Sequence, residues 1–104
     1  MIYTLVRSIM VPGKMGEYSE VTIKELAPLF PKIGMTLVAS LHAYTGNMNE
    51  IFTLNSFKDI ADYQKAMEAQ KTNKEWLRVN AKANQFRVSQ TMTILEPNPW
   101  SPMK

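Results

Sequence analysis

The sequence lacks cysteine, has a single histidine and contains no long apolar run. Without cysteine the chain forms neither a disulfide nor a cysteine-based metal or redox centre, which fits a cytoplasmic setting. No stretch approaches the roughly 20 apolar residues that a membrane-spanning helix needs, so we expect no membrane insertion. We also expect no signal peptide, because the first residues lack a cationic segment and Arg7 interrupts their apolar run.

A large excess of one charge is also missing. The 104 residues carry a net charge of +3, with 45% apolar and 20% charged residues, which is typical of one globular domain. Four cations recur at helical spacing and form a basic ridge: Lys71, Lys74, Arg78 and Lys82. The ridge is typical of a solvated helix face, and the alternative is contact with an anionic ligand. A nucleic-acid surface would add interleaved aromatic residues and more positive charge, so we expect no nucleic-acid partner.

The apolar periodicity predicts seven elements. Strands are expected at 2–11, 35–45, 50–57 and 87–95, and helices at 14–33, at 59–71 and from Thr72 onward. Pro28 and Pro31 should kink or break the first helix, and Thr72 with Glu75 forms a capping-box pattern that begins the last one. The order β-α-β-β-α-α-β predicts a ferredoxin-like α+β fold, with one four-stranded antiparallel sheet and helices on one face.

The last residues contain several prolines, which cannot enter the interior of a sheet. We therefore expect one domain over residues 1–96, followed by an extended proline-rich tail over residues 97–104. The tail is a candidate for joining dimers into a larger oligomer.

The first strand is apolar on both faces, whereas a sheet with one face in water would alternate with polar residues. The hairpin of the second and third strands can be set in a register that gathers six apolar residues on one face, because register tends to follow the apolar pattern. These residues are Leu37, Ala39, Leu41, Ala43, Phe52 and Leu54. We expect this face to pack on a second copy, which would bury roughly 1,500 Å² or more in a homodimer.

The same register gives the opposite face of the hairpin a mixed character. It would hold Thr36, Val38, Ser40, His42, Tyr44, Ile51, Thr53, Asn55 and Phe57. Polar side chains beneath helices need hydrogen-bond partners or a hydrated pocket. This face is therefore the first place to expect a small organic ligand.

Short motifs spread along the chain also carry information. They are Tyr3, Pro12-Gly13-Lys14, Gly46 with Asn49-Glu50, and Leu95-Glu96-Pro97 with Ser101-Pro102. In this order and spacing they resemble the NIPSNAP family over the whole chain. The resemblance implies a dimeric α+β barrel, in which two ferredoxin-like sheets pack face to face with helices outside. It implies no settled reaction, although the wider superfamily of such barrels includes monooxygenases and haem-degrading enzymes.

The sequence departs from that family at pocket positions. The resemblance would place an acidic residue and an arginine near Thr4 and Val6, whereas the arginine here is Arg7. It would also place histidine and tryptophan where Thr53 and Asn55 stand. Any pocket that the family shares would therefore be altered in this chain.

His42 is the candidate catalytic residue. No Asp or Glu shares its predicted face, so we expect no metal site, and no motif indicates a cofactor. His42 is either a structural, hydrogen-bonded side chain or a pocket residue that binds ligand or moves a proton. Arg7 would pair with a carboxylate of its own chain or of the partner in the dimer, or bind an anion in a pocket. The further ligand-binding candidates are Tyr44, Thr53, Asn55, Trp76 and Gln90, for which core packing or a hydrogen bond across the sheet is the alternative.

Three functions stay open at this point. The chain is a homodimeric small-ligand-binding or interaction module, a cofactor-independent small oxygenase or isomerase with His42 as base, or a purely structural assembly protein. A cavity of about several hundred Å³ lined by His42, Thr53 and Asn55 would favour the first two functions. A fully packed interface between helices and sheet would favour the third.

Overall fold

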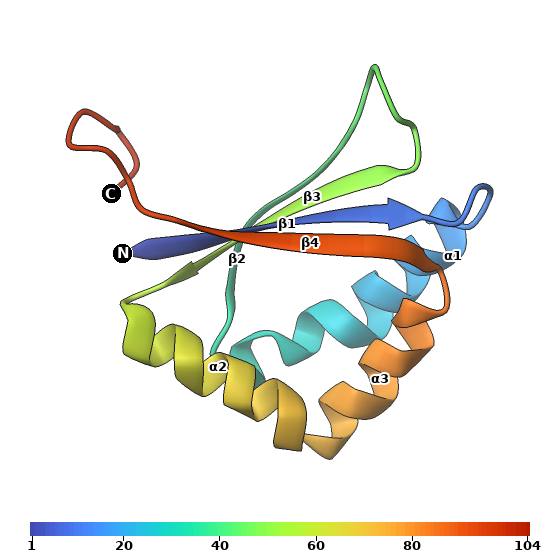
Figure 1. The fold of residues 1–104 in the computed structure, drawn as a ribbon. Helices are drawn as coiled ribbons and strands as arrows, with labels where there is room; N and C mark the ends of the chain where they lie inside the picture. The colour runs from blue at the N-terminus through green and yellow to red at the C-terminus, as the bar shows by residue number, and fades with distance from the viewer.

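One antiparallel sheet of four strands organises the protein, whose 104 residues are all described in a computed structural model (Figure 1). The strands are β1 (Ile2–Met10), β2 (Thr36–His42), β3 (Glu50–Phe57) and β4 (Arg87–Leu95), in the spatial order β2-β3-β1-β4. The α-helices are α1 (Met15–Val21), α2 (Ile60–Thr72) and α3 (Lys74–Asn84). The order with β1 and β3 in the middle is ferredoxin-like, so the predicted α+β fold is confirmed.

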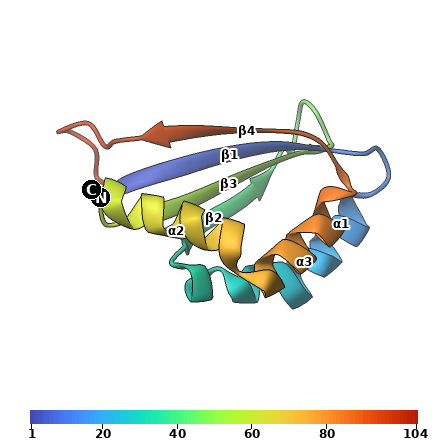
Figure 2. The ribbon, with the colours of Figure 1, turned by 60° about the horizontal axis from the view of Figure 1, so that its bottom comes forward.

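The helices all lie on one side of the sheet, and no helix covers the other side (Figure 2). We call the two sides the helix face and the open face. Along β1, Ile2, Thr4 and Met10 are buried beneath the helices, whereas Arg7 is exposed on the open face. The period of two along a strand explains why these side chains divide in this way.

The segment after α1 departs from the single helix predicted for residues 14–33. The α-helix ends at Val21, a π-helical turn η1 (Thr22–Leu26) follows, and two 3₁₀ turns complete the segment, η2 (Ala27–Leu29) and η3 (Pro31–Ile33). A proline has no N–H to donate and its ring clashes with the carbonyl four residues earlier, so the prolines at η2 and η3 exclude regular α-helix. Gly34 then ends the segment with φ of 84°.

The core forms between this segment, α3 and the helix face of the sheet. Fourteen buried residues form it: Ile2, Met10, Tyr18, Leu26, Leu29, Phe30, Ile33, Met35, Ile51, Phe57, Ala66, Trp76, Val79 and Ala83. Phe30, which lies between η2 and η3, and Trp76 of α3 have ring centres 5.8 Å apart. Phe57 and Tyr63 join β3 and α2 edge to face at 5.5 Å.

Helix α3 begins one residue later than predicted. Asn73 is extended, with φ of −73° and ψ of 113°, and its side-chain oxygen accepts a hydrogen bond from the Trp76 amide at 2.9 Å. Thr72 still belongs to α2, because its hydroxyl donates to the Glu68 carbonyl at 3.2 Å. The capping residue is therefore Asn73, and the predicted capping box at Thr72 is wrong by one position.

A bulge in β2 alters the predicted apolar row. Ala39 lies opposite Leu54 and Leu41 lies opposite Phe52, as predicted, but the register shifts between Leu37 and Ala39. Leu37 then lies opposite Asn55 on the helix face, and Thr36 moves to the open face opposite Ser56. The extra residue at the bulge reverses which face the earlier residues take. Leu37 and Thr36 were therefore assigned to the wrong faces, and β2 ends at His42 instead of residue 45.

Two segments rise on the open side of the sheet, at opposite ends (Figure 1). One is the hairpin loop, residues 43–49, and the other is the C-terminal tail, residues 96–104. The tail turns back instead of running straight, and the Tyr3 hydroxyl donates to the Lys104 carbonyl at 2.6 Å. Apolar side chains tip both segments, since Tyr44 is 97% exposed and Trp100 is 80% exposed.

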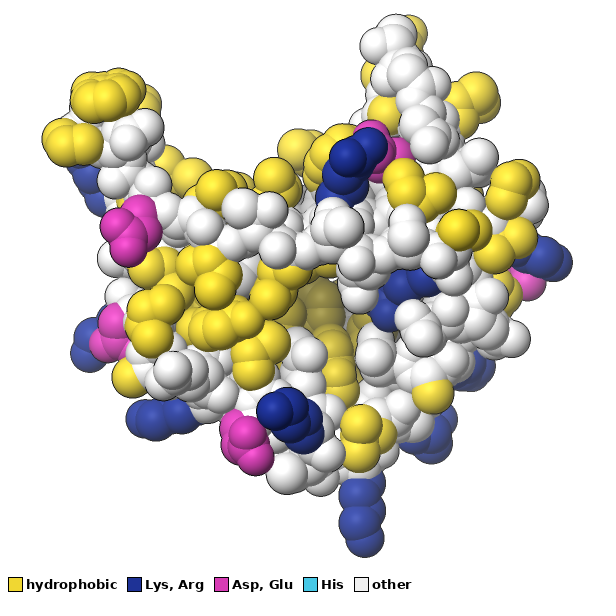
Figure 3. All heavy atoms as spheres, in the orientation of Figure 1, with side chains coloured by type: hydrophobic (Ala, Val, Ile, Leu, Met, Phe, Trp, Pro, Cys, Tyr) yellow, Lys and Arg dark blue, Asp and Glu magenta, His cyan; other side chains and the backbone are white.

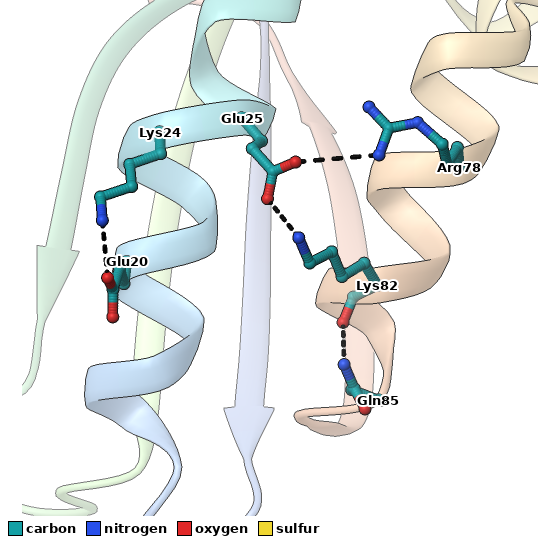
Figure 4. A network of polar contacts seen from close by, with 6 residues as sticks. All are labelled: Glu20, Lys24, Glu25, Arg78, Lys82 and Gln85. Atoms are coloured by element: carbon teal, nitrogen blue, oxygen red, sulfur yellow. Dashed lines mark hydrogen bonds and ion pairs between the residues drawn. The ribbon is translucent and has the colours of Figure 1, made fainter.

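An ion-pair network ties η1 to α3 (Figure 4). The Glu25 carboxylate accepts a hydrogen bond from Lys82 Nζ at 2.6 Å and lies 3.8 Å from a guanidinium nitrogen of Arg78. The hydrogen bond from Lys82, followed by the nearby positive charges, holds the pKa of Glu25 below its ordinary value. Two members of the predicted basic ridge, Arg78 and Lys82, therefore bind a neighbouring turn, while Lys71 and Lys74 form no ion pair.

Replacing Asn73 by alanine should lower the free energy of unfolding by about 1 kcal/mol, because the first turn of α3 loses its side-chain acceptor. Thr72→Ala is the matched control, since it removes an oxygen one position away and leaves the cap in place. Urea unfolding followed by circular dichroism measures both. A larger loss for Thr72→Ala than for Asn73→Ala would contradict the assignment of the cap.

Glu25→Gln should lower the unfolding midpoint at pH 7, and this difference from the parent should fade in acid. A carboxylate whose folded-state pKa is lowered stabilises the fold above its unfolded-state pKa, and this contribution disappears as the pH falls through the folded-state pKa. Thermal unfolding between about pH 7 and pH 3 covers the ordinary carboxyl range. Glu68→Gln, at an exposed position of α2, is the control. An equal Glu25→Gln effect at both ends of this range would exclude the ion pairs as its cause.

Candidate functional site

A cavity of about 280 Å³ lies between the helix face of the sheet and the helices. Figure 3 shows it as a hollow beneath β4 with apolar side chains in its depth. Its volume is near the lower end of small-molecule sites, which run from roughly 300 to 1,000 Å³. The interface between helices and sheet is therefore not fully packed.

The sheet supplies a polar wall. Thr4 and Asn55 lie opposite each other on β1 and β3, with 2% and 1% of their surfaces exposed. Thr53 lies two residues along β3, and Gln90 on β4 donates to the Ser8 hydroxyl at 3.3 Å. The side-chain oxygen of Asn55 is buried and accepts no hydrogen bond from the protein. A buried amide oxygen without a donor is costly, so this wall is suited to a molecule that brings one.

The helices supply an apolar wall. Trp76 of α3 is buried and packs against Phe30, and both line the cavity with Leu26 and Met67. The position of Trp76 follows from the Asn73 cap, which fixes the first turn of α3. A site with one polar and one apolar wall suits an organic molecule with both kinds of surface.

One end of the cavity holds a cation. Arg87, the first residue of β4, donates to the Asn80 side-chain oxygen at 3.0 Å and to the Tyr18 hydroxyl at 3.2 Å. Its guanidinium carbon lies 5.3 Å from the centre of the Tyr18 ring, a cation–π distance. Its Nε is buried and has no acceptor. The lining of the cavity contains no Asp or Glu.

The structure brings four of the predicted candidates together at this cavity and leaves three outside. The four are Thr53, Asn55, Trp76 and Gln90. Arg7 lies on the open face and pairs with Glu50 of the same chain. His42 is exposed at the end of β2, and Tyr44 is exposed in the hairpin loop. The cavity expected around His42 is therefore displaced toward β4, because β2 is an edge strand whose His42 end rises away from the helices (Figure 1).

The residues that sequence reasoning missed are Arg87, Asn80 and Tyr18. Strict alternation along β4 would place Arg87 on the open face with Ser89. The register shifts between Ile9 and Met10 of β1, and Arg87 lies opposite Met10 on the helix face. No sequence signal marked this shift, although the arginine at the start of a predicted strand was visible.

The open face presents an apolar patch. Its residues lie on adjacent strands in register: Leu5, Leu54, Phe52, Ala39 and Leu41. Leu41 is 61% exposed. The Arg7–Glu50 pair lies beside this patch and balances its own charge. Elsewhere, no group of three His, Cys, Asp or Glu side chains comes together to hold a metal ion. None of the helices has the length and apolar character to cross a membrane.

Comparison with known proteins gives a consistent result. The model of the NIPSNAP family matches residues 3–102. The fold is similar to that of a NIPSNAP family protein of unknown function from Agrobacterium tumefaciens, with a TM-score of 0.92, 20% identity, and coverage of 100% of this chain and 94% of that one. It is also similar to an uncharacterized NIPSNAP domain protein from Burkholderia xenovorans, with a TM-score of 0.91, 15% identity, and coverage of 98% and 99%.

A second group of similar folds has a different description. A putative antibiotic biosynthesis monooxygenase from Nitrosomonas europaea has a TM-score of 0.71 and 13% identity, with coverage of 93% of this chain and 98% of that one. At this identity the likeness shows the fold alone. No curated protein matches the sequence.

Proposed function

Because this chain belongs to the NIPSNAP family, for which no specific activity is established, we propose its function from its own geometry: it is a homodimer that binds a small organic molecule between the sheet and the helices. The observation that carries the proposal is the buried, unpartnered oxygen of Asn55 in the wall of the cavity. Native proteins pair nearly all buried polar groups with protein atoms, ordered water or another molecule, so the open position at Asn55 supports a binding role for the cavity.

Binding without chemistry is the function that the geometry favours. The one histidine that was a candidate base lies outside the cavity. The putative monooxygenases share the fold at too low an identity to transfer a reaction. The polar groups that do line the cavity are amides, hydroxyls and one guanidinium, which hold and orient a ligand.

The homodimer rests on the open face. Four strands about 4.8 Å apart and about eight residues long cover roughly 500 Å² of sheet, less than the roughly 800 Å² that each partner contributes to a standard interface. The hairpin loop and the C-terminal tail rise on the same side with exposed apolar tips, so they can supply the remaining area. The patch carries no unpaired charge, because Arg7 is bound to Glu50. A second copy fits this surface, because it presents the same apolar patch, the same exposed tips of loop and tail, and no unpaired charge.

Ligand binding is tested with a panel of octanoate, phenylacetate and their amides, followed by NMR of the Trp76 indole. We expect at least one probe to shift that signal, and Thr53→Phe to weaken the binding at least tenfold by filling the cavity. Ser40→Phe is the matched control, since Ser40 lies opposite Thr53 but does not line the cavity. If no probe perturbs the indole, or if both variants bind alike, the cavity is not a binding site.

The dimer is tested by light scattering at micromolar concentration. We expect twice the mass of the 11.9 kDa chain for the parent protein and a monomer for Leu41→Lys, because a lysine would be buried in the interface. Leu77→Lys is the control, since Leu77 is an exposed leucine of α3, far from the open face. A monomeric parent protein would rule out the dimer.

A further inference from the structure

We propose that the cavity selects a small organic carboxylate, with Arg87 as the group that binds the carboxylate. The inference rests on the proposed binding function of the cavity and adds the chemical class of the ligand. The Asn55 oxygen indicates only that a molecule binds, whereas Arg87 indicates the charge of that molecule.

Arg87 carries a positive charge that no acidic group of the protein balances. The guanidinium is held by an amide oxygen and a phenol, and it takes part in none of the ion pairs of the structure. A half-buried cation with neutral partners keeps most of its charge unbalanced. A carboxylate ligand would balance it and could engage two nitrogens at once, which is the strongest geometry for this pair.

No acidic group of the cavity competes with an anionic ligand for Arg87. No acidic side chain lines the cavity, so no carboxylate of the protein takes the position next to Arg87 that a ligand carboxylate would take. Arg87 is also the only cation in the lining, and a single positive charge matches a monoanion better than a phosphate ester with about two negative charges. Asn80 and Tyr18 hold the guanidinium in place, so little side-chain freedom is lost when an anion binds.

The surface that leads away from Arg87 also points to the class of ligand. Arg87 lies opposite Met10 of β1 and Asn55 lies opposite Thr4, which separates the two ends by about 20 Å of backbone along the sheet. Between them on the helix face lie the Ser8–Gln90 pair and then Val6 opposite Met92, and Trp76 of α3 lines the same cavity. A ligand that starts at Arg87 therefore passes the Gln90 amide and then meets apolar side chains, which suits a carboxylate on an alkyl or aryl body.

The test compares each acid with its uncharged amide of equal shape. Octanoate is paired with octanamide and phenylacetate with phenylacetamide, and affinities are measured by calorimetry at pH 7. We expect at least one acid to bind tenfold or more tightly than its amide. Arg87→Gln should remove this preference while leaving amide binding within about twofold. Arg87→Lys should keep an intermediate preference, since it retains the charge but loses the two-nitrogen contact.

Arg78→Gln is the matched control, because it changes the net charge equally but pairs with Glu25 outside the cavity. It should bind both probes as the parent protein does. Equal affinity for acid and amide in the parent protein would overturn the carboxylate while leaving the cavity as a binding site. An acid preference that survives Arg87→Gln would overturn Arg87 as the binding group. Binding of no probe at all would overturn both this inference and the proposed function. Circular dichroism confirms that each variant is folded.

Discussion

The pairing of β1 with a strand on each side is the interaction on which the rest of the structure depends. β1 bonds β3 along one edge and β4 along the other, so its alternation decides the faces of both neighbours. Asn55 lies opposite Thr4 and Gln90 lies opposite Ser8, so both share the helix face with their partners on β1. The polar wall of the cavity therefore depends on this pairing, because it places Thr4, Asn55 and Gln90 of three strands on the same face.

Much of the fold could be predicted because its signals are local. β-branched strands, two prolines in the first helical segment and the order of the elements were sufficient for the ferredoxin-like arrangement. The boundaries were less accurate, as the start of α3 shows, because Thr72 and Asn73 are both capable caps and only the backbone at Asn73 is extended. Which of the two residues caps α3 depends on where α2 ends, and the apolar periodicity of the sequence does not give that position.

The candidate site was predicted in part, and the errors have two physical causes. Parity along β3 found Thr53 and Asn55 because that strand is regular, whereas bulges reversed the faces at Leu37 and Arg87. A bulge is an extra residue that the pairing tolerates, so an apolar pattern alone does not locate it. His42 has the expected parity opposite Ile51, but helices do not cover that end of an edge strand. A position that faces the helix side was therefore not sufficient for a place in the cavity.

The hollow between sheet and helices also has a thermodynamic consequence. Space that no side chain fills forgoes the packing contacts that would otherwise hold the two layers together. Any molecule that enters it supplies those contacts only to the folded chain, so ligand occupancy and folding become linked equilibria. At a concentration 100 times its dissociation constant, such a molecule adds about 2.7 kcal/mol to the free energy of unfolding. For a domain of this size that is a substantial share of the total, so the abundance of the folded protein would follow the supply of its ligand.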